Sequence, residues 1–410
     1  MTPIFSVRTV ILSGGERYSL VVDKRSGLPI YAANLFLTCR IRNTSQSHAS
    51  IAANAGCLVL LLRFCVESGI DLADRFAKCI YLSRHEIDSL RDFCTFNFSK
   101  WAGYDEIAIQ PLKQLIREKR RVAKTTIYRR LTVIANFLKW YATQLLPLDQ
   151  REQDDIKDMA SALLHSRPIP KARNSGLVDK GLSAEQVACL LDVMEPDSLN
   201  NPFSYNVRRR NRLIVLLEYE LGIRGGELLN VRIEDFDFSK NTLLVVRRAD
   251  QYDDTRVRQP LVKTQDRQLI LSDWLISEVH NYLITDRNSI SNSKKCAYLF
   301  ITYKDGPTQG KALTITAYTK MWRTIQQHRP LLADITAHRL RHTWNYRFSE
   351  LMDSEHFDLT ESEQEATRSV LMGWKQGSGT ARLYNKRFVE KKAFEAGLKL
   401  QEIAMKGVNL

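Results

Sequence analysis

The sequence predicts a mainly α protein with a small β-sheet, built from two domains of which the second is α+β. Three observations lead to this prediction. A length of 410 residues is typical of two domains, each long enough to bury its own core. Apolar residues recur at helical spacing over most of the chain. Short runs with strand character occur only at the N-terminus and within the second half.

The N-terminal extension, residues 1–44, is expected to hold a β-hairpin. Residues 7–12 and 18–22 have strand composition and flank the turn sequence Ser13-Gly-Gly-Glu16. A second turn signal lies at 25–29. We therefore expect strands across residues 5–37.

Residues 45–165 are expected to form a helical domain. The apolar face over 51–68 ends before Gly69, a suitable glycine for a helix end. Ser83 and Glu86 have the spacing of a capping box, which opens a helix through residue 93. A last helix is expected over about residues 125–146, with its apolar stripe at Ile127, Leu131, Ile134, Leu138 and Tyr141.

Residues 166–180 are interpreted as a linker, because they hold two prolines and a glycine and lack an apolar period. The second domain, 181–410, starts with a capping box at 183–186 and has a helix over 212–221 that ends at Gly222. Strand character follows at 242–248 and 257–271, the latter as two short strands around a turn at 263–266. Helices continue from there into a C-terminal helical tail.

The charge balance favours a polyanionic partner. The chain has 60 Lys and Arg against 46 Asp and Glu, a net charge of +14, which favours nucleic acid over a membrane surface, although a basic enzyme would have the same balance. A basic cluster at the start of the predicted helix near residue 125 could follow a phosphate backbone, or could equally be a solvated helix face. Its members are Arg117, Lys119, Arg120, Arg121, Lys124, Arg129 and Arg130.

Cysteine usage and the N-terminus predict a cytoplasmic protein. The seven cysteines form no CxxC pair and are odd in number, which argues against a zinc ribbon and against a disulfide framework. No signal peptide pattern is present. The longest apolar run, 57–62, is broken by Arg63 and is too short to span a bilayer.

Two stretches of the second domain have residues suited to a phosphate group. His338 and Arg341 are three apart in Thr336-Ala-His-Arg-Leu-Arg-His-Thr-Trp344, so on a helix they share a face. Arg224 follows a helix end, and Glu227 is close enough to orient it. Guanidinium and imidazole groups both donate hydrogen bonds to phosphate oxygens. The alternatives are a solvated basic helix face and a surface arginine in a turn.

Two further stretches have residues suited to proton transfer and nucleophilic attack. Lys263, at a predicted turn, could deliver a proton to a leaving oxygen, although a lone loop lysine is usually a solvated one. Trp374 offers an indole donor. Tyr384 lies among Arg382, Lys386 and Arg387, a positive field that favours its phenolate and makes it a candidate nucleophile. The alternative is a packing tyrosine.

Taken in order, these stretches resemble the tyrosine recombinase (phage integrase) family of site-specific DNA recombinases. The matching pieces are Gly222-Ile-Arg-Gly-Gly-Glu-Leu-Leu229, Lys263-Thr-Gln-Asp-Arg-Gln-Leu-Ile-Leu271, His338-Arg-Leu-Arg-His342, and Gly373-Trp374 with Tyr384. The resemblance is strongest over about residues 180–390, and residues 45–165 resemble the family's core-binding domain in layout. It implies a two-lobed clamp around double-stranded DNA.

The resemblance also implies a mechanism and its partners. Tyr384 would attack the scissile phosphate, Arg224 and Arg341 would bind its non-bridging oxygens, and Lys263 would protonate the 5′-oxygen. His338 would assist proton transfer at the tyrosine and Trp374 would donate to the phosphate. The reaction would need no metal ion, ATP or other cofactor, and no carboxylate cluster typical of a two-metal nuclease is apparent. The partners would be DNA with specific recombination sites and further copies of the chain.

The sequence departs from the family's pattern in places. Trp374 stands where most members have histidine, and it lies ten residues before Tyr384, one more than usual. The acidic segment 353–365 is most simply a solvated loop, or else it caps a helix or contacts a neighbouring copy. Two other functions stay open: a type IB topoisomerase or telomere resolvase with a related site, and a non-catalytic DNA-binding module of the same fold.

Overall fold

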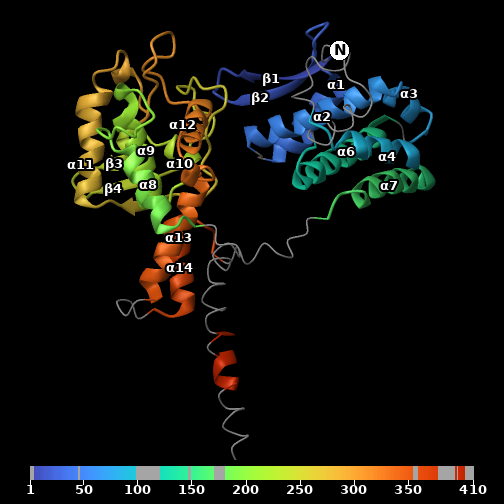
Figure 1. Cartoon of the computed structure of the whole chain (residues 1–410). Coiled ribbons are helices and arrows are strands. Elements are labelled where there is room, and N and C mark those ends of the chain that lie inside the picture. The colour runs from blue at the N-terminus through green and yellow to red at the C-terminus, as the bar shows by residue number, and fades with distance from the viewer. Residues whose placement is uncertain are drawn as a thin grey trace, which may run out of the picture. The chain divides into compact units, whose positions relative to one another are not determined.

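The computed structural model of the chain describes residues 4–44, 47–97, 121–145, 149–169, 181–353, 359–376, 393–394 and 396–401. The chain divides into two compact units, Met1–Leu177 and Val178–Leu410, each of which is described by itself (Figure 1). As predicted, the fold is mainly α with small antiparallel sheets.

The first unit is a β-hairpin followed by helices that share one core. Strands β1 (Phe5–Ile11) and β2 (Arg17–Asp23) pair antiparallel along their whole length. The helices are α1 (Tyr31–Phe36), α2 (His48–Glu67), α3 (Leu72–Ala77), α4 (Arg84–Phe93), α6 (Lys124–Leu145) and α7 (Gln150–His165), with a π turn at Leu37–Ile41 and a 3-10 turn at Arg42–Thr44.

The prediction of strands over residues 5–37 is wrong beyond β2, because the chain is helical from Tyr31. The Asn34 side chain explains the difference. Its Oδ1 accepts a hydrogen bond from the Val21 N–H at 2.9 Å, and its Nδ2 donates to the Val21 carbonyl at 2.8 Å. One amide therefore pairs both backbone groups that a third strand would have paired at this position.

The helices predicted for this unit are confirmed. Gly69, with φ +66°, follows α2, and Ser83 and Glu86 form the capping box of α4. Among the described residues, α2 is the one helix long and apolar enough to cross a bilayer. Its Leu58 and Leu61 are buried in the core against the stripe of α6, so α2 has the position of a core helix.

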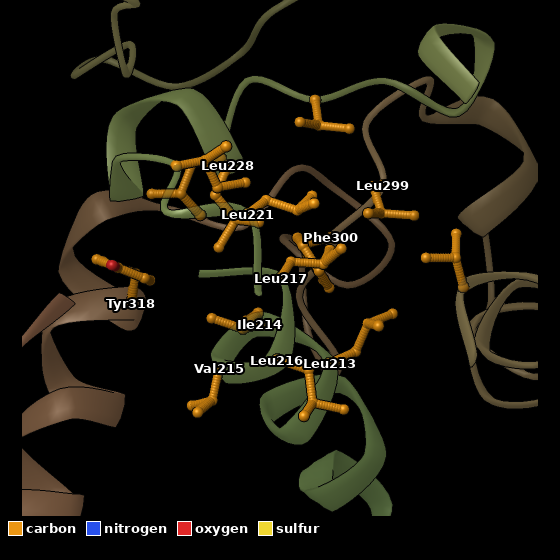
Figure 2. Packing of buried hydrophobic residues seen from close by; sticks show 14 of the residues in the cluster. Leu213, Ile214, Val215, Leu216, Leu217, Leu221, Leu228, Leu299, Phe300 and Tyr318 are labelled. Atoms are coloured by element: carbon orange, nitrogen blue, oxygen red, sulfur yellow. The ribbon is translucent and has the colours of Figure 1, made fainter. Parts of the chain in front are cut away.

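The second unit combines helices with a three-stranded antiparallel sheet of order β3-β4-β5. Its elements are α8 (Ala184–Met194), α9 (Tyr205–Leu221), α10 (Gly225–Leu228), β3 (Phe236–Asp237), β4 (Thr242–Val245), β5 (Arg267–Ile270), α11 (Asp273–Tyr282), α12 (Ile315–His328), α13 (Ala337–Asp353) and α14 (Glu361–Met372), with short 3-10 and π turns between them. Helix α9 crosses the core, where Leu213 and Leu217 pack among buried residues that include Phe300 and Tyr318 (Figure 2).

The capping box before α8 and the end of α9 at Gly222 are confirmed, although α9 starts earlier than expected. The prediction of a strand over 257–262 is wrong. Here the Gln259 side chain bonds backbone groups of Arg248 and Asp250, and Pro260 has no N–H to give to a ladder. The favoured interpretation of 353–365 as a solvated loop is wrong from Glu361, whereas the alternative that this segment caps a helix is confirmed, because Thr360 and Glu363 form a capping box that opens α14.

Candidate active site

Arg224 stands between two helices. After α9, Gly222 has φ +60°, a left-handed conformation that glycine adopts without strain. Arg224 is then the N-cap of α10. Its Nη1 donates to Oε1 of Glu227 at 3.2 Å, and its side chain is 32% exposed. One carboxylate thus holds a guanidinium that solvent can still reach.

Glu227 is buried and accepts hydrogen bonds from three neighbours. Besides Arg224, the donors are the Thr264 hydroxyl at 2.8 Å and the Arg267 guanidinium at 2.7 Å. Burial acts to raise the pKa of Glu227, but the charge and hydrogen bond of Arg267, helped by the charge of Arg341, hold the pKa below its ordinary value. The ionised Glu227 side chain therefore links α10 through hydrogen bonds to Thr264, just before β5, and to Arg267.

Lys263 lies in the long connection between β4 and β5, and its side chain is exposed. The residues after it are fixed. Thr264 donates to Glu227, and the Gln265 N–H donates to the Gly373 carbonyl at 2.9 Å. The backbone beside Lys263 is therefore attached both to α10 and to the end of α14.

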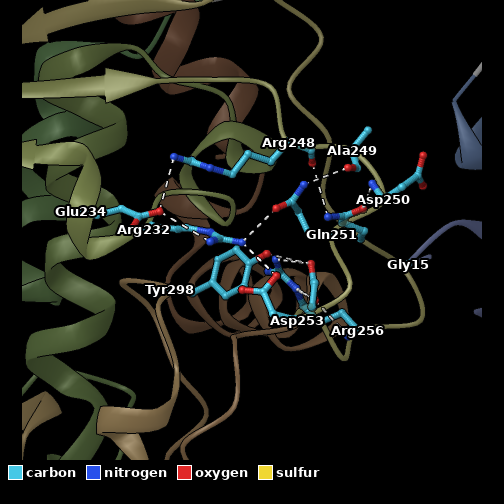
Figure 3. Close-up of polar contacts among 12 residues, drawn as sticks. Gly15, Arg232, Glu234, Arg248, Ala249, Asp250, Gln251, Asp253, Arg256 and Tyr298 are labelled. Atoms are coloured by element: carbon cyan, nitrogen blue, oxygen red, sulfur yellow. Dashed lines mark hydrogen bonds and ion pairs between the residues drawn. The ribbon is translucent and has the colours of Figure 1, made fainter. Parts of the chain in front are cut away.

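The earlier part of the same connection is anchored by the buried ion pair of Arg256 with Asp254 and by contacts of arginines with the Tyr298 ring (Figure 3). Arg256 pairs with Asp254 and donates to the Leu229 and Leu313 carbonyls at 2.8 and 3.1 Å. The guanidinium groups of Arg256 and Arg232 both lie over the Tyr298 ring, 4.4 and 5.2 Å from its centroid. These contacts fix Asp254 and Arg256 in a part of the connection that is not a strand.

Arg341, on α13, is 2% exposed. Its Nη1 donates to the Gly222 carbonyl at 2.7 Å, and its Nη2 donates to the Met372 carbonyl at 3.0 Å. Its guanidinium carbon lies 5.4 Å from the centroid of the Trp374 ring. Arg341 therefore joins the end of α9, two residues before Arg224, to the end of α14, two residues before Trp374.

His338 precedes Arg341 in the sequence, and Trp374 follows it. His338 is exposed, one turn before Arg341 on α13, and its ring is 4.5 Å from that of His342. Trp374 is buried, and its backbone N–H donates to the Ser369 carbonyl at 2.8 Å after Gly373 turns the chain with φ +64°.

The structure thus connects Arg224, Glu227, Arg341, Trp374 and the segment after Lys263 through hydrogen bonds and charges. His338 lies on the same helix as Arg341. Tyr384 lies outside the described residues, as do most residues of the C-terminal tail.

The basic cluster of the first unit is described only in part. Arg117, Lys119 and Arg120 lie outside the described residues. Arg121, Lys124 and Arg129 are exposed. Arg130 differs from them, because its Nη1 donates to the carbonyls of Cys94 at 2.7 Å and Phe96 at 2.8 Å. The Arg130 guanidinium therefore caps carbonyl groups just after the end of α4, within the first unit.

Sequence reasoning missed Arg267. This arginine bonds Glu227, Thr264 and the Leu371 carbonyl. A signal was present in the sequence: Arg267 stands two residues before Leu269, on the buried face of an alternating strand. An arginine in a core-facing position requires acidic or carbonyl partners nearby.

Comparisons with known proteins show the family of this chain. The phage integrase family matches residues 180–388, which is more than half of the chain. Tyrosine recombinase XerA of Pyrococcus furiosus is 26% identical over 277 residues, covering 67% of this chain and 78% of that protein. Transposase A from transposon Tn554 of Staphylococcus aureus is 25% identical over 310 residues, covering 73% of this chain and 75% of that protein.

A solved structure of the Tn1549 transposon integrase with a circular intermediate DNA aligns with a TM-score of 0.43 and 15% identity, covering 80% of this chain and 99% of that one. The family match extends over all four stretches that carry the candidate site, from Arg224 to Tyr384. The chain therefore belongs to the phage integrase family of tyrosine recombinases.

Proposed function

We propose that this enzyme is a site-specific DNA recombinase that cuts and rejoins DNA through a 3′-phosphotyrosyl link to Tyr384, with no metal ion or ATP. The observation that carries the proposal is the paired attachment of Arg224 and Arg341. One is held by Glu227 and the other by the Gly222 carbonyl, two residues before Arg224. Two guanidinium groups at one place suit the non-bridging oxygens of a phosphodiester, where negative charge grows in the transition state.

The proposed cleavage moves the phosphoryl group from the 5′-oxygen to Tyr384. The Tyr384 hydroxyl oxygen bonds to phosphorus and its proton passes to His338, while the bond from phosphorus to the 5′-oxygen breaks. Lys263 gives that oxygen a proton, so that a 5′-hydroxyl leaves. Trp374 donates an N–H to the phosphate. Attack of a 5′-hydroxyl from another strand reverses these steps and rejoins DNA without an external energy source, because the phosphotyrosyl bond keeps the energy of the phosphodiester.

Double-stranded DNA is the proposed substrate, and further copies of the chain are proposed partners on it. A net charge of +14 supports a polyanionic substrate. The exposed Arg121, Lys124 and Arg129 are proposed to contact phosphates, together with Arg117, Lys119 and Arg120. For Arg130 the internal contacts to Cys94 and Phe96 favour a structural role instead.

The test begins by recovering a preferred duplex from a random-sequence library by binding to the full chain. That duplex is then nicked at successive positions, so that cleavage releases a short 5′-hydroxyl strand and traps the adduct. The protein should form adducts that survive denaturing gels, and Tyr384→Phe should bind the duplex and form none. Adducts that persist in Tyr384→Phe would refute the nucleophile assignment. Efficient relaxation of a supercoiled plasmid lacking the selected sequence would instead favour a topoisomerase.

A further inference from the structure

Arg267 occupies a core-facing position of β5. The strand alternates, so that Arg267 is 7% exposed while Ile270, at its other end, is 80% exposed. A buried guanidinium keeps its charge, so its position is set by the groups that compensate it. Those groups belong to three different segments of the second unit.

The three nitrogens of the Arg267 guanidinium each donate to a different segment. Nη2 donates to Oε2 of Glu227 at 2.7 Å, Nη1 to the Thr264 hydroxyl at 3.0 Å, and Nε to the Leu371 carbonyl at 2.7 Å. These partners lie on α10, beside Lys263, and in the last turn of α14. A guanidinium is planar and rigid, so its three bonds fix the directions of these segments relative to one another.

We propose that Arg267 is a positioning residue, which sets the place of Arg224 through Glu227 and that of Lys263 through Thr264. The proposal rests on the proposed function, since it assigns to these two residues the roles given there. In this proposal Arg267 does not contact the phosphate itself, but it supports the arginine that does.

Charge balance explains why a second cation is needed. Glu227 is buried and lies between the guanidinium groups of Arg224 and Arg267, so the three groups together have a net charge of +1. Arg267, 3% exposed at its side chain, makes the closer contact, 2.7 Å against 3.2 Å for Arg224. Without Arg267, Arg224 would be the nearest cation that compensates a buried carboxylate, and less of its charge would be available to a phosphate.

A lysine at position 267 tests geometry at constant charge, because one ammonium cannot reach three segments in fixed directions. Adduct formation is measured by single-turnover kinetics on the nicked selected duplex. A second substrate has sulfur in place of the bridging 5′-oxygen. A thiolate leaves without a proton, so this substrate bypasses the general acid. Lys263→Ala gives the benchmark: slow on the oxygen substrate and restored on the sulfur substrate.

Arg267→Lys should slow adduct formation on the oxygen substrate by about 100-fold, the size of effect expected for a misplacement of about 1 Å. On the sulfur substrate the deficit should shrink to about 10-fold, because the displaced Lys263 no longer matters whereas Arg224 still does. Ile270→Thr, on the same strand but its exposed face, should match the unsubstituted protein on both substrates.

The outcomes separate the two proposals. If the unsubstituted protein forms no adduct on either substrate, the proposed function fails. If it reacts and Arg267→Lys either reacts equally fast or has the same deficit on both substrates, the positioning role of Arg267 is overturned. Should Arg267→Lys fail to fold, as judged by circular dichroism, Thr264→Val replaces it. Removing that hydroxyl should cost about 10-fold, restored by the sulfur substrate, and the lack of any restoration would overturn the link to Lys263.

Discussion

Arg341 donates a hydrogen bond to the carbonyl oxygen of Gly222, the residue that ends helix α9 two positions before Arg224. The carbonyl groups at a helix end have no partner within the helix and are available to such a donor. The geometry of one candidate phosphate ligand is therefore coupled to the backbone that presents the other. The same guanidinium reaches the Met372 carbonyl, so the end of α14 belongs to this arrangement.

Arg341→Lys should keep the charge and lose most of this geometry. A lysine supplies donors from one nitrogen and cannot hold two carbonyls on separate helices in fixed directions. We expect adduct formation to fall by at least about 100-fold, as when a preorganised oxyanion donor is removed. Unfolding free energy should drop by about 1–3 kcal/mol. Single-turnover cleavage and urea unfolding measure these changes.

Arg347→Lys is the matched control, because Arg347 lies on the same helix with an exposed side chain. It should change neither quantity appreciably. Full activity of Arg341→Lys would mean that positive charge at this place suffices and that the coupling to Gly222 has no role in catalysis.

Gly373→Ala should disturb the candidate site at the end of helix α14. Gly373 has φ +64°, and a Cβ there would lie 2.8 Å from Nη1 of Arg267 and 2.8 Å from the Gln265 carbonyl oxygen. The substitution combines backbone strain of about 1–3 kcal/mol with displacement of the segment after Lys263. We expect a lower melting temperature and slower adduct formation.

Gly56→Ala is the control for that experiment, because nothing lies within 4 Å of a Cβ at Gly56 and the residue is inside helix α2. There alanine should be neutral or stabilising by up to about 1 kcal/mol. An equal loss of stability in both variants would show that the close approach at Gly373 is not what matters.

What the sequence predicted well depends on local signals. The ends of α2 and α9 were predicted from Gly69 and Gly222, whose left-handed backbone is a local requirement. The capping boxes of α4 and α8 were equally local, because four residues contain the donors and the acceptors. The spacing of His338 and Arg341 placed them on one helix for the same reason.

The sequence predicts poorly those features that depend on contacts between residues far apart in the chain. The helix at Tyr31 forms beside a hairpin whose Val21 backbone groups are paired by Asn34. Nothing near Arg267 in the sequence indicates that Glu227, 40 residues earlier, and Leu371, 104 residues later, are its partners. Such contacts follow from tertiary packing, which outweighs local preference.

Lys124 and Arg130 should separate DNA binding from folding in the first unit. Lys124 is exposed at the start of α6, whereas Arg130 bonds the Cys94 and Phe96 carbonyls. Lys124→Gln should weaken DNA binding and reduce the slope of log affinity against log salt by about 0.9, one phosphate contact. Arg130→Gln should instead lower the unfolding free energy by about 1–3 kcal/mol by leaving two carbonyls unpaired.

Binding titrations at several salt concentrations and urea unfolding measure the two effects. An unchanged salt slope in Lys124→Gln would remove Lys124 from the proposed DNA contact surface. A changed slope without loss of stability in Arg130→Gln would return Arg130 to that surface.

Glu218 should make the stability of the second unit depend on pH. It is fully buried on α9, burial raises its pKa to about 8 against the hydrogen bond from Tyr318, and among the described residues its Oε2 has no hydrogen-bond partner. Between its ordinary pKa of 4.5 and about 8, the unfolded chain has lost this proton while the folded chain retains it. Below pH 4.5 the protonated Glu218 gives its full contribution to stability. As pH rises from 4.5 to about 8, the unfolding free energy should fall by up to about 1.4 kcal/mol per pH unit.

Glu218→Gln isolates this contribution, because an amide of the same shape is neutral at every pH in the window and can still accept from Tyr318. Other titrating groups are common to both proteins and cancel in the difference. The difference in unfolding free energy between Glu218→Gln and the unsubstituted protein should therefore move in favour of glutamine as pH rises from about 5 to about 8. A difference that stays constant over that range would show that Glu218 is ionised in the folded protein, and a cation near Oε2 would then have to be sought.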